Sequence, residues 1–214
     1  MNRARGFTLV ELLVTMTVAS ILLAWGIPNL QLTLAANRLA TQTNNFTTAL
    51  ALARSEAMQL GVPVTLCKSA NGTSCAATGG YQQGWIVFAE NTGAAPGAFN
   101  ASAVTYAAGA VSNLPIRRAN GSVLAAGTPV PAGGITSAPD QILATGLPIS
   151  GGNTLTGNNN ISNRITFDSQ GMTMMLGTFT VCDAKRDGHE RRIVVNMTGR
   201  AELQRSDGDG AASC

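Results

Sequence analysis

A single carboxylate, Glu11, lies near the start of an otherwise apolar run from Phe7 to Ile27. At about 1.5 Å per residue, a helix of this length spans roughly 30 Å, the thickness of the hydrocarbon core of a bilayer. A charge within such a segment costs about 2–3 kcal/mol near its centre, so Glu11 predicts a functional role. Arg3 and Arg5 precede the run, and they favour the cytoplasmic side for that end.

The four cysteines, Cys67, Cys75, Cys182 and Cys214, all follow the apolar run. An even number of cysteines in an oxidising compartment predicts two disulfides, for which three pairings exist. We favour Cys67–Cys75 and Cys182–Cys214, because each of these closes a local loop. Zinc binding is the competing interpretation, but there is no Cys-x-x-Cys, and the single histidine, His189, follows a turn signal. We therefore expect no metal site.

The composition favours a secreted β-rich domain over a cytosolic enzyme. Charged residues make up 12% of the chain and aromatic residues 5%. The formal net charge is +3, and without Arg3 and Arg5 it falls to about +1, which indicates little about nucleic acid. The sequence contains no nucleophile elbow, P-loop or dinucleotide fingerprint. We expect a non-enzymatic protein without a cofactor.

Helical periodicity continues behind the apolar run, over residues 28–61. Gly26 and Pro28 predict a kink where the helix leaves the membrane, and Gly61 and Pro63 predict its end. This second half is amphipathic, because apolar residues recur on one face at helical intervals: Leu32, Leu39, Phe46, Leu50, Ala53, Ala57 and Leu60.

Residues 62–214 form one predicted β-rich globular domain, long enough to have its own core. Between Asn91 and Asn160 the chain is rich in Gly, Ala, Pro, Asn and Ser, which predicts loops with short strands at three apolar islands: Ala103–Tyr106, Asn113–Arg117 and Ile142–Ile149. Elsewhere short apolar runs predict strands at Val62–Cys67, Gly84–Glu90, Arg164–Asp168, Thr178–Cys182, Arg191–Met197 and Arg200–Leu203.

The stretch Gly6-Phe7-Thr8-Leu9-Val10-Glu11 resembles the leader motif of type IV pilins. The resemblance implies that prepilin peptidase removes the leader, residues 1–6, by cutting after Gly6. Phe7 then becomes an N-methylated N-terminus, and residues 7–27 are the transmembrane half of the helix. It also implies that Glu11 pairs with the amino group of Phe7 on a neighbouring subunit, a buried pair that is favourable only when both partners are present.

Two other interpretations of the N-terminus fit less well. An ordinary secretory signal peptide has a shorter apolar run than this one, and it ends at an Ala-x-Ala site that is missing here. A plain membrane anchor explains the apolar run, but it leaves the Gly6-Phe7 junction and Glu11 unexplained.

Four further blocks resemble, in the same order, the GspH/FimT family of minor pilins and pseudopilins. The family fold implied is α+β: a long N-terminal helix packed on a β-rich domain of two antiparallel sheets, in agreement with the change of periodicity. The blocks are Ala53-Arg54-Ser55-Glu56-Ala57, Gly84-Trp85-Ile86-Val87-Phe88, Phe167-Asp168-Ser169-Gln170-Gly171 and Arg192-Ile193-Val194-Val195-Asn196-Met197-Thr198-Gly199-Arg200.

Each block also has a purely structural interpretation. Asp168–Gly171 and Thr198-Gly199 are predicted hairpin turns, in which a glycine supplies a positive φ. Trp85 and Phe88 are predicted core residues, and Arg200 is predicted to be solvated.

Some FimT-type minor pilins bind DNA through a C-terminal Gly-Arg-x-Arg motif. The matching stretch here is Gly199-Arg200-Ala201-Glu202, so an acid replaces the second arginine. Arg205 lies three residues further on, and Arg191 and Arg192 are other possible DNA contacts. Basic and acidic residues are balanced from Asp183 onward, whereas phosphate binding needs clustered positive charge. We therefore favour a mixed-charge solvated surface over DNA binding.

We expect a minor pilin of a type IV pilus, anchored in the bacterial inner membrane with its domain in the periplasm. The expected partners are prepilin peptidase and other minor and major pilins or pseudopilins. The alternative is a minor pseudopilin of a type II secretion system. Two disulfides and the Gly199-Arg200 ending favour the pilus, although both systems share the fold and the leader. A secreted module released by signal peptidase is the third interpretation.

Overall fold

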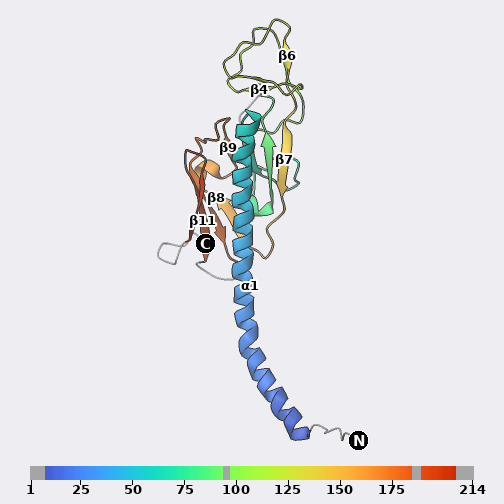
Figure 1. Cartoon of the computed structure of the whole chain (residues 1–214), viewed down its shortest axis with the longest axis vertical. Coiled ribbons are helices and arrows are strands. Elements are labelled where there is room, and N and C mark those ends of the chain that lie inside the picture. The colour runs from blue at the N-terminus through green and yellow to red at the C-terminus, as the bar shows by residue number, and fades with distance from the viewer. Residues whose placement is uncertain (1–7, 94–96, 185–188, 206–214) are drawn as a thin grey trace, which may run out of the picture.

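One long helix, α1 (Leu9–Leu60, 52 residues), forms the long axis of the molecule (Figure 1). The computed structural model describes residues 8–93, 97–184 and 189–205. Thr8 caps the helix start, because its hydroxyl oxygen accepts a hydrogen bond from the Glu11 N–H at 3.3 Å. Gly61 ends the helix as predicted, with φ 67° and ψ 18°, and its N–H donates to the carbonyl oxygen of Ala57.

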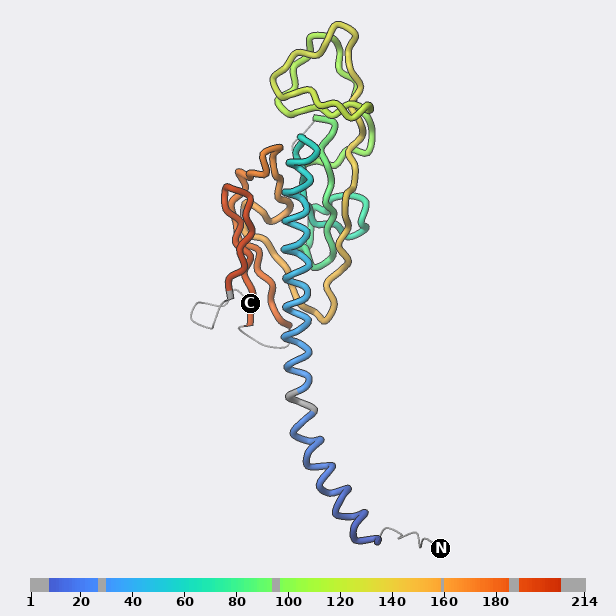
Figure 2. The backbone as a smooth tube through the Cα atoms, in the orientation of Figure 1, coloured from blue at the N-terminus to red at the C-terminus, as the bar shows by residue number. Residues whose placement is uncertain are grey.

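Only the C-terminal part of α1 packs on the domain. The residues buried there include most of the predicted apolar face: Leu39, Phe46, Leu50, Ala53 and Ala57. Leu32, predicted on the same face, is instead 47% exposed, because it precedes the part of the helix that the domain covers. The helix continues through Gly26 and Pro28, and its N-terminal part curves away from the axis of the rest (Figure 2).

Two four-stranded antiparallel sheets pack against α1, in the α+β architecture predicted. The strand order is β7-β2-β1-β9 in the first sheet and β12-β11-β10-β8 in the second. β8 (Thr154–Gly157) was not predicted, because Leu155 is its one buried apolar residue. Besides β8, the two sheets and the short helices beside them consist of β1 (Val64–Lys68), η1 (Tyr81–Gln83), β2 (Trp85–Ala89), β7 (Gln141–Gly146), η2 (Asn159–Ile161), β9 (Arg164–Phe167), β10 (Gly177–Cys182), β11 (Glu190–Val195) and β12 (Ala201–Arg205).

Phe46 of α1 lies in the core that joins the helix to both sheets. Its ring centroid is 4.8 Å from that of Phe179 in β10, 5.2 Å from Trp85 in β2 and 5.5 Å from Tyr81, all in edge-to-face geometry. Trp85 and Phe179 belong to different sheets, so one side chain connects three layers. Trp85 and Phe88 are both buried, as predicted.

A separate lobe lies beyond the C-terminal end of α1 (Figure 1). It is built from two small antiparallel ladders, β3 (Thr105–Tyr106) with β6 (Ile135–Thr136) and β4 (Ile116–Arg117) with β5 (Val123–Leu124). The rest of the lobe is turns and loops, in agreement with the composition of this region.

Two buried carboxylates attach the lobe to the first sheet. Glu90, directly after β2, accepts a hydrogen bond from the N–H of Gly97 at 2.8 Å. Asp140, directly before β7, accepts hydrogen bonds from the N–H of Thr92 at 3.1 Å and the N–H of Asn100 at 2.8 Å. Since these contacts use charged side chains of low exposure, the attachment of the lobe is sensitive to their protonation.

Replacing Glu90 by glutamine is expected to make the free energy of unfolding less dependent on pH. Burial raises the pKa of the Glu90 carboxyl above its ordinary value of 4.5, and hydrogen bonds from Thr65 and Gly97 oppose part of this rise. The Glu90 carboxyl therefore keeps its proton to a higher pH in the folded protein than in the unfolded chain. Its contribution to stability falls as the pH rises through the pKa of the folded state.

Denaturant midpoints of the full chain in detergent, taken between about pH 5 and pH 8, measure this effect. For Glu90→Gln, the midpoint should depend less steeply on pH than it does for the wild type. The variant should not lose stability at the upper end of this pH range. An equal dependence of the midpoint on pH in Glu90→Gln and the wild type would contradict a raised pKa of the Glu90 carboxyl.

Candidate functional site

The N-terminal half of α1 is an apolar surface that the rest of the described chain leaves uncovered. Leu9 is 77% and Trp25 82% exposed. By length and composition, α1 is the one helix in the described ranges that could cross a membrane. Its hydroxyl groups donate to carbonyls of the preceding turn, as a lipid environment requires: Thr15 to Leu12, Thr17 to Val14 and Ser20 to Thr17.

Glu11 is the only charged residue of α1 before Arg38. Its side chain is exposed in the first turn of the helix, next to the Thr8 cap. Gly6 and Phe7, the predicted cleavage and methylation positions, lie outside the described residues. A carboxylate in an apolar surrounding needs a cationic partner, so Glu11 stays the predicted assembly residue.

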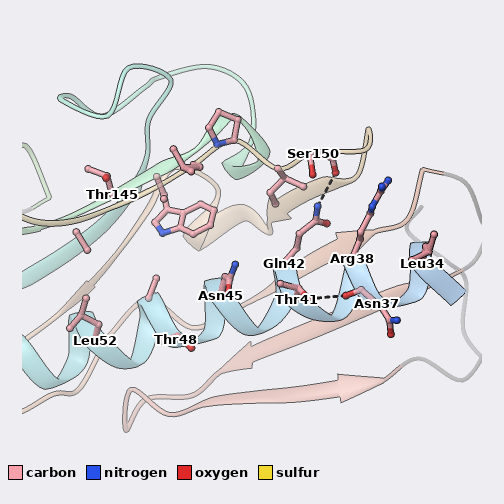
Figure 3. Close-up of a pocket in the computed structure, with 17 residues that line it drawn as sticks. Leu34, Asn37, Arg38, Thr41, Gln42, Asn45, Thr48, Leu52, Thr145 and Ser150 are labelled. Carbon is pink, nitrogen blue, oxygen red and sulfur yellow. Dashed lines mark hydrogen bonds between the residues drawn. The ribbon is translucent and has the colours of Figure 1, made fainter.

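A groove of about 720 Å³ runs between α1 and the chain at the end of β7 and just after it (Figure 3). Residues 144–150 form one wall, and the side chain of Trp85 also lines the space. The wall is held to the helix by Gln42, whose Nε2 donates to the carbonyl oxygen of Ser150 at 2.8 Å. Asn153 Nδ2 donates to Gln42 Oε1 at 2.7 Å. Sequence reasoning missed this groove, because its wall comes from a segment about a hundred residues from the helix.

Three of the sequence blocks meet at the C-terminal end of α1. Nε of Arg54 donates to the carbonyl oxygen of Gly171 at 3.0 Å. Both predicted turns are present, with φ 75° at Gly171 and φ 73° at Gly199. The turns touch so closely that a Cβ atom on Gly199 would lie 2.1 Å from the oxygen of Gly171. These blocks therefore build a packed junction of helix and turns, which is a structural role.

The predicted DNA-contact arginines lie in and beside β11 and β12, where acidic residues accompany them. Arg192 forms an ion pair with Glu190 at 2.5 Å, and Arg200 forms one with Glu202 at 3.7 Å. Arg200 is solvated as predicted, with a side chain that is 73% exposed. Arg191 is half-buried. The side chain of Arg205 lies outside the part of the protein that the structure describes.

The Cys67–Cys75 disulfide is present, with an S–S distance of 2.03 Å. Cys182 is disulfide-bonded, and Cys214, its predicted partner, lies outside the described residues, so that pairing stays a prediction. His189 is exposed. Among the side chains that the structure describes, no group of three or more His, Cys, Asp and Glu residues could hold a metal ion.

Removing the Cys67–Cys75 bond by the double change Cys67→Ala and Cys75→Ala is expected to lower the free energy of unfolding by about 2–3 kcal/mol. The bond closes a loop with a sequence separation of 8, and a cross-link reduces the entropy of the unfolded chain. Denaturant unfolding of the full chain in detergent measures the change. Thr73→Ala, an exposed change in the same loop, should have almost no effect; an unaltered midpoint in the double variant would disprove the stabilisation.

Comparison with known proteins agrees with the two sequence resemblances. The family model described as type II transport protein GspH matches residues 42–199, and the model of the prokaryotic N-terminal methylation motif matches residues 1–27. Two crystal structures of the Pseudomonas aeruginosa type IV minor pilin FimU are similar. One is 14% identical, covering 83% of this chain and 95% of that chain with a TM-score of 0.47. The other is 15% identical, covering 78% and 92% with a TM-score of 0.43. Among curated proteins, no sequence matches the chain.

Proposed function

Because this chain belongs to the family of type II transport protein GspH, we propose that it is a minor pilin of a type IV pilus. In this role it is a non-enzymatic subunit that primes or caps filament assembly together with other minor and major pilins. The observation that carries the proposal is the uncovered apolar half of α1 with its single carboxylate, joined without a break to a folded domain. Such a stem can pass from a bilayer into a bundle of like helices.

The match of residues 1–27 to the N-terminal methylation motif supports processing of the leader. Prepilin peptidase cuts after Gly6, and Phe7 becomes the methylated N-terminus. The stem then anchors the protein in the inner membrane with the domain in the periplasm, where the Cys67–Cys75 disulfide is stable. Mass spectrometry of the membrane-extracted protein tests this step: a chain that begins at N-methylated Phe7 supports it, and a chain that begins elsewhere contradicts it.

A minor pseudopilin of a type II secretion system is the second candidate, favoured by the description of the family model that matches. A clean deletion strain, scored for surface pili and for secreted exoproteins, separates the two. Lost or reduced piliation with intact secretion supports the pilus. Normal pili with exoproteins retained in the periplasm support the pseudopilus and contradict the first proposal. A strain that is normal in both respects contradicts both candidates.

DNA binding is not favoured, because Arg192 and Arg200 each lie beside a carboxylate. These acids offset the positive charge that phosphate contacts require. A gel-shift measurement of the full chain in detergent with duplex DNA at low salt tests the point. We expect no shift; a shift that Arg200→Ala weakens would restore the DNA-uptake role.

A further inference from the structure

A pocket of about 300 Å³ lies at the root of the lobe, where the lobe of Figure 1 joins the first sheet. Its walls come from the chain just after β2, from the end of β4 with the turn that follows it, and from the segment that leads into β7. Ligand sites in proteins have volumes from about 300 Å³ upward, so this pocket has the size for a small molecule. Its charged and amide side chains are Asn91, Arg117, Arg118, Asp140 and Gln141.

Hydrogen bonds fix the walls of the pocket to one another. The N–H of Arg117 donates to the carbonyl oxygen of Asn91 at 3.0 Å, and the N–H of Ala138 donates to the carbonyl oxygen of Arg117 at 2.6 Å. Asn91 Nδ2 donates to the carbonyl oxygen of Pro139 at 2.8 Å. All three segments are therefore held in place by the fold itself, and the pocket is preformed.

Two arginines give the pocket a positive charge. The side chains of Arg117 and Arg118 are half-buried, and neither makes an ion pair or a hydrogen bond with a residue that the structure describes. Asp140 also lines the pocket, but its two oxygens accept the backbone hydrogen bonds that attach the lobe. Two guanidinium groups and one carboxylate leave a net charge of +1, which fits a ligand with one negative charge. Guanidinium groups match the geometry of a carboxylate in particular.

The same lining has an acceptor and a donor without partners. Asn91 Oδ1 and Arg118 Nε are buried, and neither has a hydrogen-bond partner among the described residues. Asn91 as a whole is only 2% exposed, and a buried polar atom without a partner is costly. A hydroxyl group can donate to an amide oxygen and accept from a guanidinium N–H. It is therefore the neutral group that suits both atoms.

We propose that this pocket binds a small hydroxycarboxylate, with its carboxylate against Arg117 and Arg118 and its hydroxyl group beside Asn91. A doubly charged phosphate fits less well, because one of its charges stays uncompensated. An α-amino acid brings a further cation, and its ammonium group cannot accept a hydrogen bond from Arg118 Nε. The bound acid contacts both the lobe and the first sheet, so it holds the lobe in one orientation. Free hydroxy acids and acidic sugars share this chemistry.

Isothermal titration of the full chain in detergent, at low salt, tests the binding. The probes are L-lactate, a free hydroxy acid, and D-glucuronate, a sugar acid; the tighter of the two identifies the source. We expect a Kd of about 1 mM or lower for that probe. Propionate is the matched control ligand, since it keeps the carboxylate and lacks the hydroxyl group. It should bind at least about tenfold more weakly, because the buried polar atoms then stay without partners.

Hydrogen exchange of the wild-type chain locates the bound acid without any substitution. The tighter probe should protect residues 116–122 and 137–141, which form the pocket walls. Arg117→Gln and Arg118→Gln should each weaken binding by at least about tenfold, since a charged partner of the carboxylate is lost. Arg191→Gln is the matched control variant: Arg191 is also half-buried but does not line the pocket. Its affinity should equal that of the wild type.

Four results would each overturn the proposal. They are the absence of saturable binding for both hydroxy acids, equal affinity for propionate, protection that maps away from the pocket walls, and unchanged affinity in both arginine variants. The measurements need no filament, so their outcome is separate from that of the proposed function.

Discussion

Replacing Glu11 by valine is expected to reduce incorporation of the subunit into the filament by more than about 100-fold. Removal of one member of a buried ion pair leaves the other charge uncompensated, at a cost of about 3–5 kcal/mol. Each 1.4 kcal/mol is about a factor of ten in an equilibrium. Glu11 has the only charged side chain on the apolar stem, so no neighbouring side chain of that stem can replace it. Quantitative immunoblots of sheared filaments and of membranes measure the ratio.

Glu11→Asp is the matched control, because it keeps the charge and shortens the side chain by one carbon. It should retain a substantial part of the incorporation. The total amount of Glu11→Val in the membrane should stay normal, since valine suits an apolar helix in lipid. Normal incorporation of Glu11→Val would show that the carboxylate has no role in assembly.

Phe46→Ala is expected to lower the free energy of unfolding by about 3–5 kcal/mol. The side chain is fully buried, and its ring contacts Phe179, Trp85 and Tyr81. Truncation leaves a cavity where α1 meets both sheets, so the loss affects all three layers. Denaturant unfolding of the full chain in detergent, followed by tryptophan fluorescence, measures the change.

Leu32→Ala is a matched control on the same helix. Sequence periodicity puts Leu32 on the face of Phe46, but the structure leaves it 47% exposed. The change should therefore shift stability by no more than about 0.5 kcal/mol. A loss as large as that of Phe46→Ala would mean that the domain covers more of the helix than the structure shows.

Local patterns in the sequence predict those features of the fold that depend on neighbouring residues. Helical periodicity identifies Leu39, Phe46 and Leu50 as core residues, because residues at such intervals lie on one face of a helix. Gly61 predicts the end of α1, since glycine adopts positive φ without strain. β8 is missed, because a strand that buries only Leu155 has no clear alternation. Leu32 lies on the predicted face but is 47% exposed, because periodicity identifies a face of the helix but not how far a domain extends along it.

The sequence by itself determines the apolar stem, the position of Glu11, the change from helix to strands and the membership of the family. These properties depend on residue type and spacing within a few turns of chain. Only the tertiary structure decides that Arg54 meets the turns at Gly171 and Gly199, and that residues 144–150 lie against α1 to form a groove. Contacts of this kind join segments about a hundred residues apart. They depend on how the sheets pack on the helix, which no local pattern specifies.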